Sequence, residues 1–206
     1  MAELETKTLK RQRQMAKLAR IGVLLVDNDS KILDLLTNVL TRLGFEEIFT
    51  AHDGFEGLQI LEEKDIDLVI TDWELKPVTE LSADDVEPNE VITTDWQQDP
   101  PKDGASFVRY LRCAPSSPNR YIPIIMLTGS TLVDNIEYAR DSGVSEILKK
   151  PITAKVLCDR VISCIESPRS HITAPSYKGP DRRRKVVPVD EERRKIDIKV
   201  IKHTGA

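Results

Sequence analysis

The sequence predicts an α/β fold in which helices cover both faces of a doubly wound parallel sheet. Four short apolar runs have the length and composition of buried strands, and segments with helical spacing of apolar residues separate them. Nearly continuous apolar character is typical of parallel strands buried on both faces. The four runs are Ile21 to Val26, Leu68 to Thr71, Ile124 to Leu127 and Ile147 to Lys149.

Between and around these runs, capping residues and apolar periodicity place the remaining elements. The first half predicts a strand over 23–26, a helix from Asp29 or Ser30 to Gly44, a strand at 48–49, a helix around 55–61 and a strand over 66–71. The second half predicts a helix around 107–111, a strand over 124–127, a helix from Ser130 or Thr131 to Gly143, a strand over 147–149 and a helix that begins at Thr153. Strict alternation of five strands with five helices indicates a doubly wound sheet.

Polar residues close the predicted strands. Asp27, Asp72, Thr128 and Lys150 each follow or end an apolar run. The carboxyl ends of parallel strands meet at one rim, where open α/β sheets bind ligands. Two acids there can hold a hard cation, and a lysine and a hydroxyl suit phosphoryl oxygens. An aspartate can also attack phosphorus, so the pattern predicts a phosphorylation site.

The same stretches, in the same order and spacing, resemble the receiver domain of two-component response regulators, in particular the single-domain chemotaxis receivers. They are I-G-V-L-L-V-D-N-D-S (21–30), D-L-V-I-T-D-W-E-L-K-P (67–77), D-G (103–104), I-P-I-I-M-L-T-G (122–129) and I-L-K-K-P (147–151). The resemblance spans 21–166 and implies five parallel strands in the order 2-1-3-4-5. It also implies a response regulator that works in phosphorelay signalling.

By this resemblance, Asp72 is the phosphoacceptor, and Thr128 and Lys150 contact the phosphoryl group. The resemblance further implies a cis bond between Lys150 and Pro151. In many receivers, an aromatic residue three positions before the lysine turns inward when the threonine moves, and that position is Ile147 here. Isoleucine is stiff and has no hydroxyl, so a switch made of Thr128 and Ile147 is not expected to work in the usual way.

The resemblance implies Mg²⁺ as cofactor and no organic cofactor. Its ligands would be Asp27, Asn28, Asp72 and the backbone carbonyl of Glu74. Asn28 stands where the family usually has a second acid, so weaker Mg²⁺ binding is expected. Asp29 is better interpreted as a helix cap than as a ligand. Because Asn28 and Ile147 depart from the family pattern, a phosphorylation-independent scaffold or adaptor stays open as an alternative.

An insertion over 77–102 separates Asp72 from Asp103-Gly104, where the family begins its third helix. It contains seven acids, one lysine and four prolines, which is a composition typical of a loop without a core. It lies at the mouth of the predicted site. A surface insertion and a lid or specificity loop for a partner kinase are equally compatible with this composition.

Two basic arms flank an acidic body. The net charge is −4 overall, +4 over 1–20 and +6 over 167–206, so the receiver body over 21–166 carries −14. The arms could fold back onto the body or contact an acidic partner, nucleic acid or an anionic membrane face. The tail over 167–206 is too short for a DNA-binding output domain with its own core. Its residues from Ile196 to Lys202 predict a short strand.

The expected partners are a histidine kinase or phosphotransferase and a downstream protein target, and a homodimer is compatible with the family. No long apolar stretch predicts a membrane span or a signal peptide. Three cysteines at unrelated spacing suit a reducing compartment, so a cytoplasmic protein is expected. The protein is not expected to be an enzyme, although it could assist its own phosphorylation and dephosphorylation.

Overall fold

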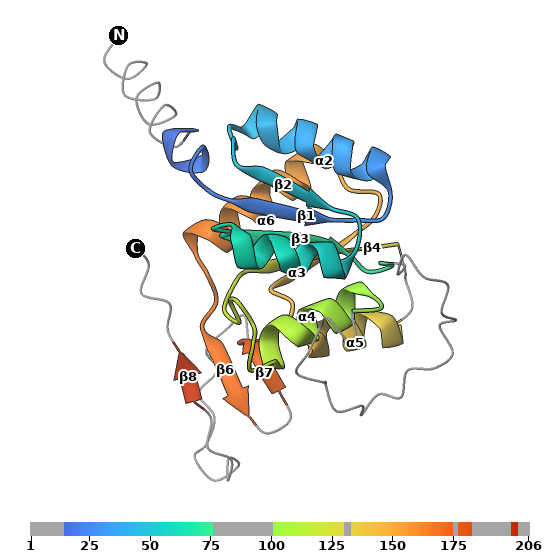
Figure 1. Ribbon diagram of the computed structural model, residues 1–206, viewed down its shortest axis with the longest axis vertical. Helices are drawn as coiled ribbons and strands as arrows, with labels where there is room; N and C mark the ends of the chain where they lie inside the picture. Colours follow the sequence, from blue (N-terminus) through green and yellow to red (C-terminus); the bar gives the residue numbers. More distant parts are fainter. Residues whose placement is uncertain (1–14, 76–100, 130–132, 175–176, 183–198, 202–206) are drawn as a thin grey trace.

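The computed structural model describes residues 15–75, 101–129, 133–174, 177–182 and 199–201. Five parallel strands form one sheet in the order β2-β1-β3-β4-β5, which confirms the predicted fold and strand order (Figure 1). The strands are β1 (Val23–Val26), β2 (Ile48–Ala51), β3 (Leu68–Asp72), β4 (Ile124–Thr128) and β5 (Glu146–Lys149).

Five helices alternate with these strands. They are α2 (Ser30–Leu43), α3 (Gly54–Glu63), α4 (Gly104–Cys113), α5 (Val133–Ser142) and α6 (Ala154–Glu166). Asp29 caps α2 by accepting a 2.9 Å hydrogen bond from the Lys31 N–H, and Gly44 ends it with φ 100°. Thr153 caps α6 as predicted. Within the described ranges, every helix is too short or too polar to cross a bilayer.

The pleat of the strands divides the core between the two faces of the sheet. In β1, Leu24 and Val26 pack on the side of α3, α4 and α5, whereas Val23 and Leu25 pack on the side of α2 and α6. All four side chains are buried. Burial on both faces explains why the strands are continuously apolar in sequence.

The tail after α6 forms a second, antiparallel sheet in the order β7-β6-β8. Its strands are β6 (His171–Ala174), β7 (Tyr177–Pro180) and β8 (Lys199–Ile201). The strand predicted over 196–202 is confirmed over 199–201 and pairs with β6. The other two strands were not predicted. Figure 1 shows this sheet beside the ends of α4 and α5.

Several predictions concern residues that the structure describes only in part. The insertion over 77–102 lies outside the described residues except for Pro101 and Lys102, and so do the predicted helix starts at Ser130 and Thr131. Of the N-terminal arm, residues 15–18 are helical, and Leu18 packs into the core on the α2 side.

Candidate functional site

Asp27, Asp72 and Lys150 converge at the carboxyl ends of β1, β3 and β5. The Lys150 ammonium lies 2.9 Å from Asp72 Oδ1 and 3.2 Å from Asp27 Oδ2. Both carboxylates are buried, whereas the Lys150 side chain is half-buried. The three residues predicted from strand ends therefore form one cluster, with the ammonium bridging two acids that are far apart in sequence.

Burial and charge act against each other in this cluster. Burial raises the pKa of Asp27, helped by the nearby charge of Asp72, while the Asp29 backbone N–H at 2.9 Å and Lys150 oppose the rise. Burial alone would lower the pKa of Lys150. Its hydrogen bond to Asp72 and the charges of Asp72 and Asp27 more than offset this and raise it. Asp27 is thus held charged in a place that disfavours its charge.

Thr128 ends β4 beside these groups. It is buried, and its carbonyl accepts a 2.8 Å hydrogen bond from the Lys150 N–H, which ties the start of the Lys150 segment to β4. The next residue, Gly129, has open space where a Cβ would lie. The hydroxyl of Thr128 therefore belongs to the same rim as the cluster, and the approach beside it is uncrowded. The Lys150–Pro151 bond is cis, as expected.

Three residues that the family pattern assigns lie at the edge of the cluster. Asn28 and Glu74 are exposed next to Asp27 and Asp72, so their role as metal ligands stays a prediction. Ile147 is half-buried and packs against the core on the α3, α4 and α5 side. Its role as a switch residue stays a prediction.

Two contacts around Asp72 were not predicted. A Cβ on Gly104 would lie 2.0 Å from the Asp72 carbonyl oxygen, so only glycine lets α4 begin this close to Asp72. Trp73 and Tyr138 form an edge-to-face pair with ring centroids 5.7 Å apart, which connects the residue after Asp72 to α5. The Asp103-Gly104 motif was recognised in the sequence as a helix start, but its contact with Asp72 was not predicted. No feature of the sequence indicates that Trp73 pairs with Tyr138.

The donor set fits a hard divalent cation. Asp27 and Asp72 supply two carboxylates that share one ammonium, and carboxylate oxygens are the ligands that a hard divalent cation prefers. No group of three or more His, Cys, Asp or Glu side chains suited to a metal gathers among the described residues. Mg²⁺ needs fewer than that, because it keeps several waters and uses one or two carboxylates.

Comparison with known proteins agrees with this geometry. The family model of the response regulator receiver domain matches residues 23–84, the part that contains Asp27 and Asp72. The chain is 26% identical over 144 residues to the chemotaxis protein CheY of Pseudomonas aeruginosa, a match that covers 70% of this chain and 95% of that protein.

Solved structures resemble the same part of the chain. A response regulator receiver domain protein from Clostridium thermocellum is 27% identical with a TM-score of 0.53, and the match covers 71% of this chain and 94% of that one. Chemotaxis protein CheY4 of Vibrio cholerae is 25% identical with a TM-score of 0.52, over 68% of this chain and 95% of that one.

Proposed function

We propose that this chain, a response regulator of two-component signalling that carries a chemotaxis-receiver-like domain, accepts a phosphoryl group on Asp72. The observation that supports the proposal most is the bridge from Lys150 to Asp72 and Asp27. This bridge supports the proposal because a carboxylate can attack phosphorus and an ammonium suits phosphoryl oxygens, and both groups lie at one rim of the sheet. Receiver domains are phosphoryl-accepting signalling domains, so no separate substrate is turned over.

In the proposed step, a carboxylate oxygen of Asp72 forms a bond to phosphorus. The bond from phosphorus to the donor atom breaks, and its electron pair leaves with the donor. Lys150 holds the charged carboxylate in place and then balances the charge on the phosphoryl oxygens, while the Thr128 hydroxyl donates a hydrogen bond to one of them. Little more than positioning and charge neutralisation is required for such a transfer.

Mg²⁺ would be held by Asp27 and Asp72, with Asn28 and the Glu74 carbonyl as neutral oxygen ligands. When bound, it would neutralise charge on the transferring group. We propose that the donor is a phosphohistidine of a kinase or phosphotransferase in the cytoplasm, with small phosphoryl donors as substitutes. The same groups could assist hydrolysis of the aspartyl phosphate.

The proposed output is a change in the surface formed by α5, β5 and α6, which a downstream protein reads. The Trp73–Tyr138 contact supports this direction of coupling because it joins the residue after Asp72 to α5. A homodimer through this face is compatible with the proposal, and size measurement before and after phosphorylation would test it.

Intact-mass measurement of the chain with Mg²⁺ and acetyl phosphate tests the proposal. The wild type should gain one phosphoryl group, and Asp72→Ala should gain none. Asp34→Ala, a change of an exposed acid on α2, is the matched control and should gain the group as the wild type does. A wild type that stays unmodified, also with a cognate kinase, would contradict the proposal and favour a phosphorylation-independent scaffold.

A further inference from the structure

A buried arginine lies where the tail meets the body, at the end of the sheet away from Asp72. Arg112 on α4 is 1% exposed. Its guanidinium donates hydrogen bonds to the carbonyls of Gly143, Arg120 and Ile122 at 2.9, 2.8 and 2.8 Å. Burial lowers its pKa to about 9, so it is still charged at neutral pH. Its acceptors among the described residues are neutral carbonyls, which leaves its positive charge without a carboxylate.

A cavity of about 120 Å³ adjoins this guanidinium, roughly ten times the space that one water molecule needs. The body contributes Arg112, Arg120 and Tyr121 to its walls, and the tail strands contribute His171, Thr173 and Lys178. No Asp or Glu is among the described residues that line it. Three residues with cationic side chains and two with hydroxyls are thus among those that line one space.

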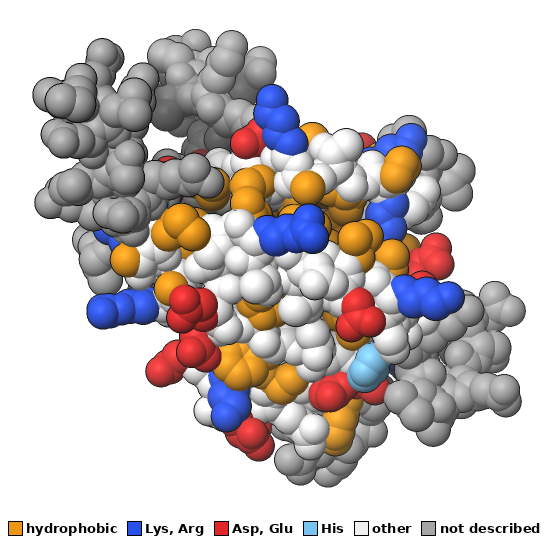
Figure 2. Space-filling model, turned by 90° about the horizontal axis from the view of Figure 1, so that it is seen from above, with side chains coloured by type: hydrophobic (Ala, Val, Ile, Leu, Met, Phe, Trp, Pro, Cys, Tyr) orange, Lys and Arg blue, Asp and Glu red, His pale blue; other side chains and the backbone are white. Residues whose placement is uncertain are grey.

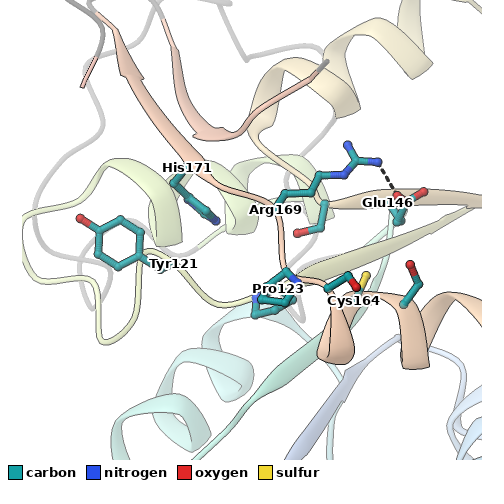
Figure 3. A pocket seen from close by; sticks show the side chains of 10 residues that line it. Tyr121, Pro123, Glu146, Cys164, Arg169 and His171 are labelled. Carbon is teal, nitrogen blue, oxygen red and sulfur yellow. Dashed lines mark hydrogen bonds and ion pairs between the residues drawn. The ribbon is translucent and has the colours of Figure 1, made fainter. Parts of the chain in front are cut away.

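A neighbouring cavity differs from this one in the charged residues that line it. It is smaller, about 30 Å³, and shares Tyr121 and His171 with the first; Figure 3 shows its lining. Its arginine, Arg169, points to Glu146 and is ion-paired with it. In the smaller cavity the chain supplies its own anion, whereas in the larger one it supplies cations and hydroxyls only.

From this we infer that the cavity between α4 and the β6–β7 hairpin binds a phosphate group. Guanidinium and ammonium groups form strong, charge-assisted hydrogen bonds to phosphate oxygens, and the burial of Arg112 strengthens its electrostatic interactions. Because the walls come from both the body and the tail, a bound phosphate would join the hairpin to α4. The group could be inorganic phosphate or part of a phosphate monoester, and both have the same recognised oxygens.

Calorimetric titration with inorganic phosphate, on the full chain, tests the inference. Arg120→Gln, at a half-buried position, and Lys178→Gln, at an exposed one, should each weaken binding about tenfold. Lys155→Gln, which removes an exposed lysine on α6, should leave it unchanged. Lys150→Gln should also leave it unchanged, which separates this cavity from the Asp72 site. A second titration, with glycerol 3-phosphate, distinguishes inorganic phosphate from a phosphate monoester as the ligand. Binding of glycerol 3-phosphate that is tighter than that of inorganic phosphate indicates a phosphate group carried on a larger molecule.

Three results would overturn the inference. The first is that neither ligand gives heat of binding up to roughly 10 mM. The second is that Arg120→Gln and Lys178→Gln bind phosphate as tightly as the wild type does. The third is that, of all the variants, only Lys150→Gln loses binding. The last result would place the phosphate at the strand ends beside Asp72. None of these results bears on whether Asp72 accepts a phosphoryl group.

Discussion

At the scale of single residues, Asp27 shows a carboxylate held where folding disfavours its charge. Lys150 neutralises one of two buried carboxylates, and the environment raises the pKa of Asp27 above its ordinary value of 3.8. A carboxyl whose pKa is raised on folding stabilises the fold below its unfolded pKa, and this contribution is lost as pH rises through the folded pKa. At pH 7, therefore, the charge of Asp27 destabilises the folded chain.

Asp27→Asn should raise the free energy of unfolding at pH 7 by about 1–2 kcal/mol, the usual size of a local electrostatic change. The gain should shrink as pH falls through the raised pKa of Asp27, because wild-type Asp27 then becomes protonated. Urea unfolding across this pH range measures it. Asp34→Asn on the exposed face of α2 serves as control and should show no such gain. A loss of stability at pH 7 would contradict the account.

Asn28→Asp adds an exposed negative charge next to the proposed metal ligands. We expect roughly fivefold to tenfold tighter Mg²⁺ binding, because one extra charge close to a divalent cation adds on the order of 1 kcal/mol near the surface. Calorimetry measures the affinity. Asn38→Asp adds the same charge on α2 and should change it little; an equal effect of both variants would show that only net charge matters.

At the scale of elements, the placement of α4 depends on one glycine. Gly104→Ala would put a methyl group 2.0 Å from the Asp72 carbonyl oxygen, so either α4 or the end of β3 must move. We expect a loss of about 2–3 kcal/mol in unfolding free energy and slower phosphorylation. Gly129→Ala is the matched control, because nothing lies within 4 Å of its Cβ position. Equal stability of the two variants would refute this role of Gly104.

The elements also show what the sequence could predict. The convergence of Asp27, Asp72 and Lys150 could be predicted from the sequence. Each residue follows or ends an apolar run typical of a buried parallel strand, and parallel strands bring their carboxyl ends together. The Trp73–Tyr138 pair depends on the rotation of α5 against β3, which apolar periodicity does not specify. The hairpin β6–β7 was missed because both strands are only four residues long, and β7, which contains glycine and proline, packs on α4.

At the scale of the whole molecule, local contacts, among them the Arg169–Glu146 ion pair, rather than net charge connect the tail to the body. Figure 2, which views the molecule from above Figure 1, shows a face that carries both acidic and basic side chains. Arg182 forms a 2.9 Å ion pair with Asp141, but both side chains are exposed by a third or more, and such pairs contribute about 0–1 kcal/mol. Gly179 lies directly against Gly143, and the Tyr177 hydroxyl donates to the Pro180 carbonyl.

Hydrogen exchange of the β6 and β7 amides should therefore change little between about 0.05 M and 1 M salt. Tyr177→Ala removes the ring that Arg182 covers at 3.9 Å and should speed this exchange at any salt concentration. Tyr121→Phe, which keeps its ring against His171, is the comparison variant and should have a smaller effect. Exchange that rises steeply with salt would mean that charge attraction between basic tail and acidic body attaches the hairpin.

The central claim is that Asp72 carries the phosphoryl group, and reduction with borohydride tests it most directly. Hydride converts an aspartyl phosphate to homoserine and releases phosphate, so peptide mass spectrometry identifies the modified position. After incubation with Mg²⁺ and acetyl phosphate, we predict homoserine at position 72, with Asp27 unchanged. Homoserine at position 27, or at neither position while intact mass shows a phosphoryl group, would contradict the account.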